Sequence, residues 1–288
     1  MLDKYYFGKV DRISPEAPVP IVNIQKEESR LGGASNVANN IVSLGGHSLL
    51  CGVIGHDLFG KEIERISRHK NIDTFLLKTS SPTITKARII GGKQQIVRVD
   101  YEDKSELNAD NKKLFRDTIS RILPEYDILV ISDYGKGLIS EDLCRYLIKL
   151  AHKYDKKVII DPKGKNWEKY SGADIVTPNV KELSDIVGYT VPNTDRAIEK
   201  AAREAITNNH LTALLVTRSD KGMSLIGPIP PIHIPTHSEE VFDVSGAGDT
   251  VVATLGLCLA AGFEISEAMR TANIAADIVV KKVGTATL

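Results

Sequence analysis

The amino-acid sequence predicts an α/β fold, in which helices cover both faces of a mostly parallel central sheet and a small β-sheet forms a lid. One observation predicts the layered core. From about residue 109, short apolar β-branched segments alternate with amphipathic segments of helical length, and this alternation is typical of parallel sheets buried between helices. A second observation predicts the lid, because the β-prone segments earlier in the chain do not follow this alternation.

The first hundred residues predict the strands of the lid. Residues 86–90 (KARII) and 95–101 (QIVRVDY) are short β-prone runs separated by Gly91-Gly92, which signals a turn. Residues 19–24 (VPIVNI) predict an earlier strand of the same kind. We expect these strands to lie over the ends of the core strands, in lid segments at about 8–31 and 82–103.

A helix is predicted between the lid segments, within residues 32–46 (GGASNVANNIVSLGG). Val37, Ile41 and Leu44 recur at helical spacing, and Gly45-Gly46 is a stop signal.

The rest of the chain predicts four core strands with helices between them. The strands are expected at 127–132 (DILVIS), 157–161 (KVIID), 173–179 (ADIVTPN) and 213–219 (ALLVTRS). Ligands of such sheets bind beyond the carboxyl ends of the strands. The polar residues at and after those ends are therefore candidate site residues: Asp133, Lys163, Asn179 and Thr217.

Composition and charge exclude several classes of function. Of 288 residues, 37 are Lys or Arg and 37 are Asp or Glu, so no bulk attraction to nucleic acid or to anionic membranes is expected. The start of the chain has no signal-peptide core, and no apolar run reaches membrane-spanning length. The cysteines Cys51, Cys144 and Cys258 are scattered in apolar stretches, which favours free thiols in the cytoplasm over disulfides or a zinc site.

The segment FDVSGAGDT, residues 242–250, predicts an anion site. Gly246, Ala247 and Gly248 precede an apolar helix expected over Thr250–Ala260, and unpaired amides at a helix N-terminus bind anions. A carboxylate beside a bound phosphate is useful if it accepts the proton of an attacking hydroxyl, so Asp249 is the candidate general base. The alternative is that Asp249 only caps the helix.

Four motifs resemble those of the ribokinase-like (PfkB) sugar kinases, in the family order and over nearly the whole chain. They are GGASN (32–36), NVKE (179–182), VTRSDKG (216–222, with Ser219 where the family has Gly) and DVSGAGD (243–249). The resemblance implies a ribokinase-like three-layer α/β/α fold with a β lid, ATP-dependent phosphorylation of a sugar, and Mg²⁺ as cofactor.

A narrower resemblance is to the kinase half of bacterial heptose kinase/adenylyltransferases, carried by SDYGKG, DPKG, TPNVKE and KVGTAT among other segments. It implies phosphorylation of the C1 hydroxyl of D-glycero-β-D-manno-heptose 7-phosphate, on the route to ADP-heptose and lipopolysaccharide. We expect one kinase domain over 1–288, without an adenylyltransferase domain and without the apolar first strand that relatives have before the segment MLD. The alternatives are a kinase for another sugar or sugar phosphate, and a non-catalytic sugar- or nucleotide-binding regulator.

The resemblance also implies roles for single residues. Asp3, Gly32, Gly33 and Asn36 are expected at the sugar, and Asp133 beside it. Asn179 and Glu182 are expected to hold Mg²⁺ through water, with a helix-capping pair as the alternative. The ATP site is expected to include Thr217, Ser219, Gly222 and Asn273, of which Asn273 is alternatively a buried polar residue satisfied within the core.

A substrate that already carries a phosphate requires cations, and four residues are candidates: Arg88, Arg98, Lys136 and Lys163. Strand alternation places Arg88 and Arg98 on one face of the lid; the alternative is that they are solvated lid charges. Asp243 is a candidate for a monovalent-cation (K⁺) site or a purely structural acid. The lid is also expected to pair two copies of the chain in a homodimer.

Overall fold

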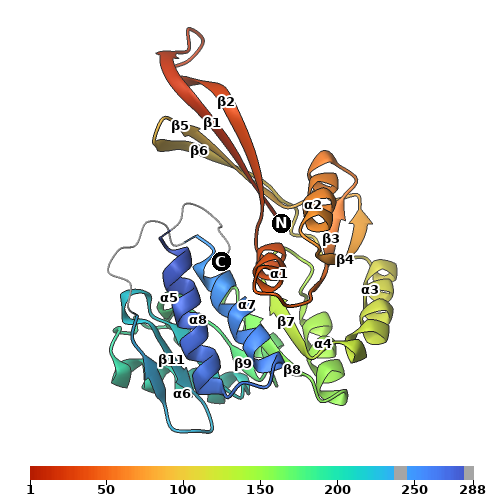
Figure 1. Cartoon of the computed structure of the whole chain (residues 1–288), viewed down its shortest axis with the longest axis vertical. Helices are drawn as coiled ribbons and strands as arrows, with labels where there is room; N and C mark the ends of the chain where they lie inside the picture. Colours follow the sequence, from red (N-terminus) through yellow and green to blue (C-terminus); the bar gives the residue numbers. More distant parts are fainter. Residues whose placement is uncertain (237–244, 282–288) are drawn as a thin grey trace.

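The computed structural model describes residues 1–236 and 245–281 of the chain. The core sheet has six strands in the order β12-β11-β10-β9-β8-β7, and a separate pair, β3-β4, lies beyond β7 (Figure 1). Strands β7 to β10 are parallel, and β11 and β12 are antiparallel additions. Their bounds are β3 Leu49–Gly55, β4 Asp73–Thr79, β7 Ile128–Ser132, β8 Lys157–Asp161, β9 Ile175–Val176, β10 Leu214–Thr217, β11 Met223–Ile226 and β12 Ile232–Ile234.

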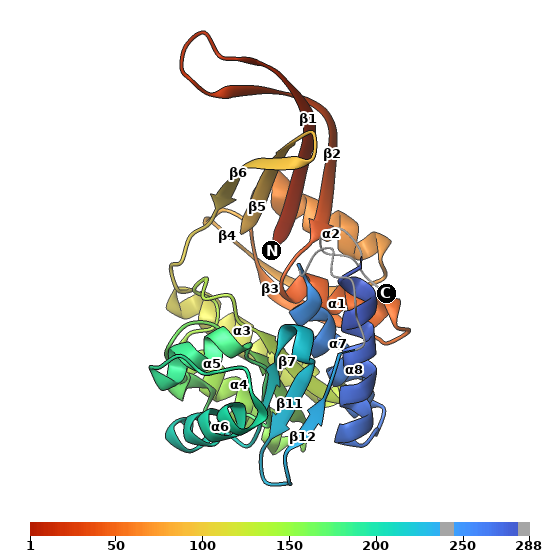
Figure 2. The same ribbon diagram turned by 90° about the vertical axis from the view of Figure 1, so that its left-hand side faces the viewer.

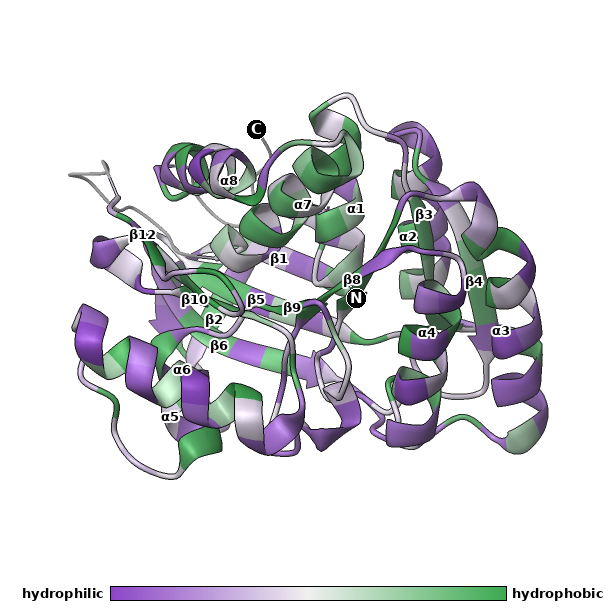
Figure 3. Ribbon diagram, turned by 90° about the horizontal axis from the view of Figure 1, so that it is seen from below, coloured by the Kyte–Doolittle hydropathy of each residue, from purple (hydrophilic) through white to green (hydrophobic). Residues whose placement is uncertain are grey.

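Helices cover both faces of this sheet, which confirms the predicted three-layer α/β/α fold. One face carries α1 (Ala34–Ser43), α7 (Ala247–Ala260) and α8 (Ile265–Val279). The other carries α3 (Ala109–Ile122), α4 (Glu141–Lys153), α5 (Val180–Val187) and α6 (Asp195–Asn209), while α2 (Leu58–His69) packs on β3, β4 and β2. Helix α7 is hydrophobic almost all round (Figure 3) because it is buried between the sheet, α1 and α8.

The lid is a four-stranded sheet in the order β2-β1-β5-β6 that projects away from the core (Figures 1 and 2). Its strands are β1 Leu2–Ile13, β2 Pro20–Leu31, β5 Thr85–Gly91 and β6 Gln94–Tyr101. The sheet begins at Leu2 rather than near residue 8, because the run Leu2 to Phe7 pairs along its whole length with β2 and with β5. The base of the lid is therefore part of the site described below.

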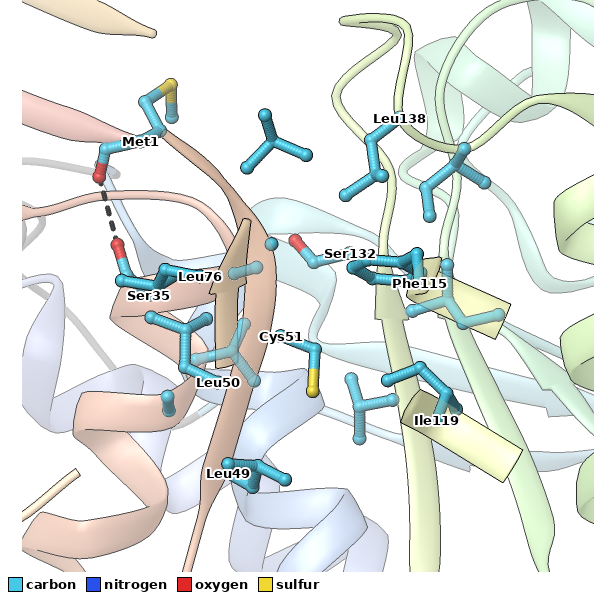
Figure 4. Close-up of a pocket in the computed structure, with 18 of the residues that line it drawn as sticks. Met1, Ser35, Leu49, Leu50, Cys51, Leu76, Phe115, Ile119, Ser132 and Leu138 are labelled. Atoms are coloured by element: carbon cyan, nitrogen blue, oxygen red, sulfur yellow. Dashed lines mark hydrogen bonds between the residues drawn. The ribbon is translucent and has the colours of Figure 1, made fainter. Parts of the chain in front are cut away.

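A cavity of about 770 Å³ lies between β3 and β7 (Figure 4). Its walls come from both strands and from α1, α3 and α4, and Met1 lies at one end.

Candidate active site

The Gly-Ala-Gly turn forms the N-terminus of α7. Gly246 is the N-cap in the left-handed conformation (φ 83°), and the helix begins at Ala247 rather than at Thr250 as predicted. Gly248 and Asp249 therefore lie in the first turn, where backbone N–H groups have no helical partner and the helix dipole is positive. A Cβ at Gly248 would meet no atom within 4 Å, so an anion can approach this turn closely.

Asp249 is almost fully buried (4% exposed) and both carboxylate oxygens accept hydrogen bonds. Asn36 of α1 donates its Nδ2 to Oδ2 at 2.8 Å. Tyr134, just after β7, donates its hydroxyl to Oδ1 at 3.1 Å. These bonds aim the carboxylate into the space at the end of the core strands, where a sugar hydroxyl would need to lie to be deprotonated.

Burial raises the pKa of Asp249 to about 6, against the opposing effect of the bonds from Asn36 and Tyr134. A base must be deprotonated to act, so kcat/KM is expected to rise with pH through this pKa and to level off above it. The raised pKa has the opposite effect on stability. The contribution of Asp249 to stability is fully present below its unfolded pKa near 3.8 and is lost as pH rises through about 6.

Replacing Tyr134 by Phe is expected to move the acidic limb of the kcat/KM profile to higher pH, by on the order of one unit. The change removes a hydrogen bond that favours the ionised carboxylate and leaves the burial of Asp249 in place. The measurement is kcat/KM from pH 5 to 9. If kcat/KM falls at every pH while the midpoint of its acidic limb stays where it is in the wild type, Tyr134 only fills space.

The residues predicted to lie at the sugar gather where β1 enters the lid. Asp3 is buried and accepts a hydrogen bond from Arg88 Nη1 at 2.6 Å. Gly32 packs against it, since a Cβ at Gly32 would lie 2.2 Å from Asp3 Oδ2. Gly33 has φ 55°, and a Cβ there would lie 3.0 Å from the ring of Tyr134. The predicted residues Asp3, Gly32, Gly33 and Asn36 thus meet around Asp249.

A second cavity, of about 190 Å³, opens on the other side of Asp249. It brings together the predicted phosphate-binding turn and the carboxyl ends of four core strands. The residues that line it include Gly246, Gly248, Asp249, Asp133, Tyr134, Asp161, Lys163, Asn179, Glu182 and Thr217. Burial, with Asp249 and Glu182 nearby, raises the pKa of Asp161 well above its usual range. The N-terminus of α7 and Lys163 bring positive charge to this cavity, and four carboxylates, those of Asp133, Asp161, Glu182 and Asp249, line it as well.

Comparison with known proteins identifies the family. The model of the pfkB family carbohydrate kinases matches residues 5–288. The chain belongs to this family. It is 46% identical over 290 residues to Bifunctional protein HldE of Haemophilus influenzae (strain PittEE) and 44% identical to that of Paramagnetospirillum magneticum (strain ATCC 700264 / AMB-1). It spans about 60% of the length of these relatives.

Solved structures of low sequence identity show that the fold is that of the ribokinase-like enzymes. Phosphofructokinase-2 from Escherichia coli in complex with potassium aligns over 99% of this chain and 91% of its own, with a TM-score of 0.82 and 22% identity. Arabidopsis thaliana ribokinase complexed with ribose and ATP aligns over 98% and 90%, with a TM-score of 0.76 and 21% identity.

Asn179 and Glu182 of the pfkB motif form the capping box of α5. Asn179 Oδ1 accepts from the Glu182 amide at 2.9 Å, and Glu182 Oε2 accepts from the Asn179 amide at 3.2 Å. Lys163 Nζ lies 3.0 Å from Glu182 Oε1. The helix cap named above as the alternative role of this pair is therefore present, and both residues also line the phosphate-side cavity. Residues 1–236 and 245–281 contain no cluster of three His, Cys, Asp or Glu arranged to hold a metal.

The expected nucleotide loop follows β10. Ser219 adopts φ 56°, the left-handed conformation that favours Gly. Gly222 has φ 74°, and a Cβ there would lie 2.0 Å from the Ile234 carbonyl oxygen. Asn273 Nδ2 donates a hydrogen bond to the Pro235 carbonyl at 2.8 Å. This contact is the one expected if Asn273 is a buried polar residue satisfied within the core. Asp243 lies outside the described residues.

Two predicted substrate residues are committed to other partners. Asp133 accepts from Lys169, from the Tyr170 hydroxyl at 2.7 Å and from the Gly135 amide at 2.7 Å. Lys136 pairs with Glu102 and lines the large cavity rather than the phosphate-side one.

Sequence reasoning missed two residues that complete the site, Tyr134 and Lys86. The Lys86 ammonium lies 5.4 Å from the centroid of the Tyr134 ring, and burial lowers the pKa of Lys86. Strand alternation offered a signal, because Lys86 is two residues before Arg88 and shares its face of β5. Arg98 lies directly opposite Arg88 and also pairs with Asp100 at 2.8 Å. The lid therefore presents three cations on one face, of which Arg88 and Arg98 are paired with Asp3 and Asp100.

Proposed function

We propose that this pfkB-family chain transfers the terminal phosphoryl group of ATP to a sugar hydroxyl. The single observation that carries the proposal is the buried Asp249 in the first turn of α7, between a sugar-side group of polar residues and a phosphate-side cavity. The hydroxyl loses its proton to Asp249, its oxygen forms a bond to the terminal phosphorus, and the bond to the ADP oxygen breaks. The amides of Ala247 and Gly248 stabilise charge on the transferring group.

Asn179 and Glu182 would hold Mg²⁺ through water at the phosphate-side cavity. The ion would neutralise charge on the phosphates. For K⁺ the candidate is Asp243, the first residue of the motif DVSGAGD (243–249). A structure of phosphofructokinase-2, which has the same fold, is a complex with potassium and supports this candidate.

The substrate we propose is D-glycero-β-D-manno-heptose 7-phosphate, phosphorylated at C1 to the 1,7-bisphosphate. Support comes from the resemblance to heptose kinase/adenylyltransferases and the high identity to HldE proteins. On the lid, Arg88 and Arg98 lie directly opposite each other, and each is paired with a carboxylate, Arg88 with Asp3 and Arg98 with Asp100.

The test is a coupled assay of ADP release across a panel of sugars and sugar phosphates. We expect turnover with the heptose 7-phosphate and a loss of at least about tenfold in kcat/KM when the same sugar lacks its phosphate. Turnover with an unphosphorylated hexose and none with the heptose phosphate would contradict the substrate. No turnover with any sugar, together with measurable ATP or sugar binding, would favour the alternative of a non-catalytic regulator.

We also propose that two copies pair through the lid. Val97 and Val99 on β6, an edge strand, are 45% and 39% exposed. Light scattering after size exclusion is expected to give twice the chain mass, and Val97→Lys with Val99→Lys is expected to give a monomer. Leu114→Lys on the outer surface of α3 is the control and should not change the mass.

We propose a cytoplasmic location because the cysteines are not paired in disulfides. Cys51, Cys144 and Cys258 are all free, as is usual in reducing compartments. In the part of the chain that the structure describes, no helix combines the length and hydrophobicity needed to cross a bilayer.

A further inference from the structure

A buried arginine lies at the start of the expected nucleotide loop, residues 218–222. Arg218 directly follows β10 and is only 2% exposed, and charged side chains are rarely buried unless they are paired. Its neighbour Thr217 lines the phosphate-side cavity. The Arg218 guanidinium lies instead among Asn193, Asp195 and Ser224. Its burial therefore calls for a role other than direct contact with a phosphate.

The guanidinium ties the nucleotide loop to the start of α6 and to β11. Its Nε donates a hydrogen bond to Asn193 Oδ1 at 2.9 Å, and its Nη1 donates one to Asp195 Oδ1 at 2.5 Å. The bond from Arg218 lowers the pKa of Asp195, so this partner is ionised. Nη1 also donates to Ser224 Oγ of β11 at 2.9 Å. The rigid, planar fork of one arginine thus fixes three segments relative to one another.

Asn193 completes this connection through the backbone of the loop. Its Nδ2 donates a hydrogen bond to the Arg218 carbonyl at 3.0 Å, and its own carbonyl accepts one from Lys221 Nζ at 2.7 Å. The Arg218 amide donates to the Gly222 carbonyl at 2.7 Å, which closes the turn. Asn193 therefore contacts the loop near both of its ends.

The other side of the loop is held by β12. A Cβ at Gly222 would lie 2.0 Å from the Ile234 carbonyl oxygen, so the loop backbone packs directly on this strand. Ser224 Oγ accepts from Arg218 and has one proton of its own, which it donates to His233 Nδ1 of β12 at 2.8 Å. The hydrogen bonds of Arg218 thus continue to the strand on which the loop rests.

We propose that Arg218 is a positioning residue for ATP. Its guanidinium, bonded to Asn193 and Asp195, holds Ser219 and Gly222 in their positive-φ conformations, 56° and 74°, before the nucleotide binds. A loop that is already ordered loses less conformational freedom on binding, which strengthens affinity. Because the occupant of the loop is ATP under the proposed function, this role of Arg218 rests on that function.

A contribution to stability alone does not explain a buried guanidinium at this position. Buried ion pairs can often be replaced by apolar residues of similar volume with little loss of stability. The directed bonds of Arg218 specify one arrangement of the loop, which an apolar side chain of the same size cannot do.

The test compares Arg218→Lys and Asn193→Ala with the control Arg65→Lys. Lysine at 218 keeps the charge and loses the fork. Asn193 is half-buried, and its replacement by Ala removes bonds to the Arg218 side chain and carbonyl without disturbing the core, so this variant serves if Arg218→Lys does not fold. Arg65 makes a similar two-bond contact with Glu62 on the surface of α2. Calorimetry gives the Kd of ATP, ADP-release assays give both KM values, and hydrogen exchange follows the amides of residues 218–223.

We expect Arg218→Lys to raise the Kd and KM of ATP at least about tenfold and Asn193→Ala at least about threefold, while KM for the sugar phosphate changes less than about twofold. The loop amides should exchange faster in both variants, and Arg65→Lys should match the wild type. A lower melting temperature with an unchanged Kd for ATP would show a purely structural Arg218 and overturn the proposal. Equal rises in both KM values would overturn it as well.

ATP binding by the wild-type chain separates this role from the proposed function. If the wild type binds ATP and both variants bind it with the same Kd, the positioning role fails and the kinase function stands. If the wild type binds no ATP, the proposed function fails and the positioning role fails with it.

Discussion

Replacing Asp249 by Asn is expected to lower kcat for sugar phosphorylation by about 10²–10⁴-fold, the range for loss of a general base. The amide has nearly the same shape as the carboxylate but cannot take the proton of the sugar hydroxyl. ATP should bind at least as tightly as before, because a negative charge next to the phosphate site is removed. Rapid-mix measurement of ADP release and calorimetric measurement of ATP binding separate the two effects.

The same substitution should leave the melting temperature unchanged or slightly higher at pH 8. Because burial raises the pKa of Asp249 to about 6, keeping this group ionised at pH 8 opposes folding. Asp117→Asn on the outer face of α3 is the matched control, since Asp117 is exposed and pairs only at the surface with Lys113. If the Asp249→Asn variant keeps kcat within about threefold of the wild type, well short of the loss expected for a general base, Asp249 is not the base.

The core strands could be predicted from sequence because each is a short β-branched run bounded by turn or helix signals. The segments 127–132 and 157–161 correspond to β7 and β8 with a shift of one residue at most. The start of α7 was placed late because Gly248 has low helix propensity, whereas the helix begins at Ala247, and its buried residues lie between Asp249 and Cys258. β3, α2, β4, β11 and β12 were not predicted, although Asp57 before an apolar-periodic segment is a helix-start signal for α2.

Sequence predicted the site residues that belong to one short motif. It did not predict those whose partners lie far away along the chain. The capping box of Asn179 and Glu182 is a three-residue spacing that sequence shows directly. The bond from Tyr134 to Asp249 spans 115 positions, and only the fold decides that the end of β7 faces the start of α7. Lys86 was missed for the same reason, since its position over Tyr134 depends on how the lid is joined to the core.

Replacing Gly32 by Ala is expected to lower kcat/KM by on the order of 10²-fold, because small displacements of positioning groups are that costly. The backbone at Gly32 is not in the left-handed region, so the new methyl group acts through contact alone. It would lie 2.2 Å from Asp3 Oδ2, which forces Asp3 to move together with Arg88, its partner at 2.6 Å. Both a sugar-hydroxyl ligand and a lid cation would then be displaced.

Gly52→Ala is the matched control, since its Cβ would meet only the Leu76 side chain at 3.7 Å, an ordinary contact. Steady-state kinetics and melting temperatures of both variants make the comparison. We expect the Gly32→Ala substitution to raise KM for the sugar phosphate more than KM for ATP, because Asp3 and Arg88 lie on the sugar side of Asp249. Equal increases in both KM values, or wild-type kinetics with a crystal structure showing Asp3 unmoved, would place sugar binding elsewhere than at the base of the lid.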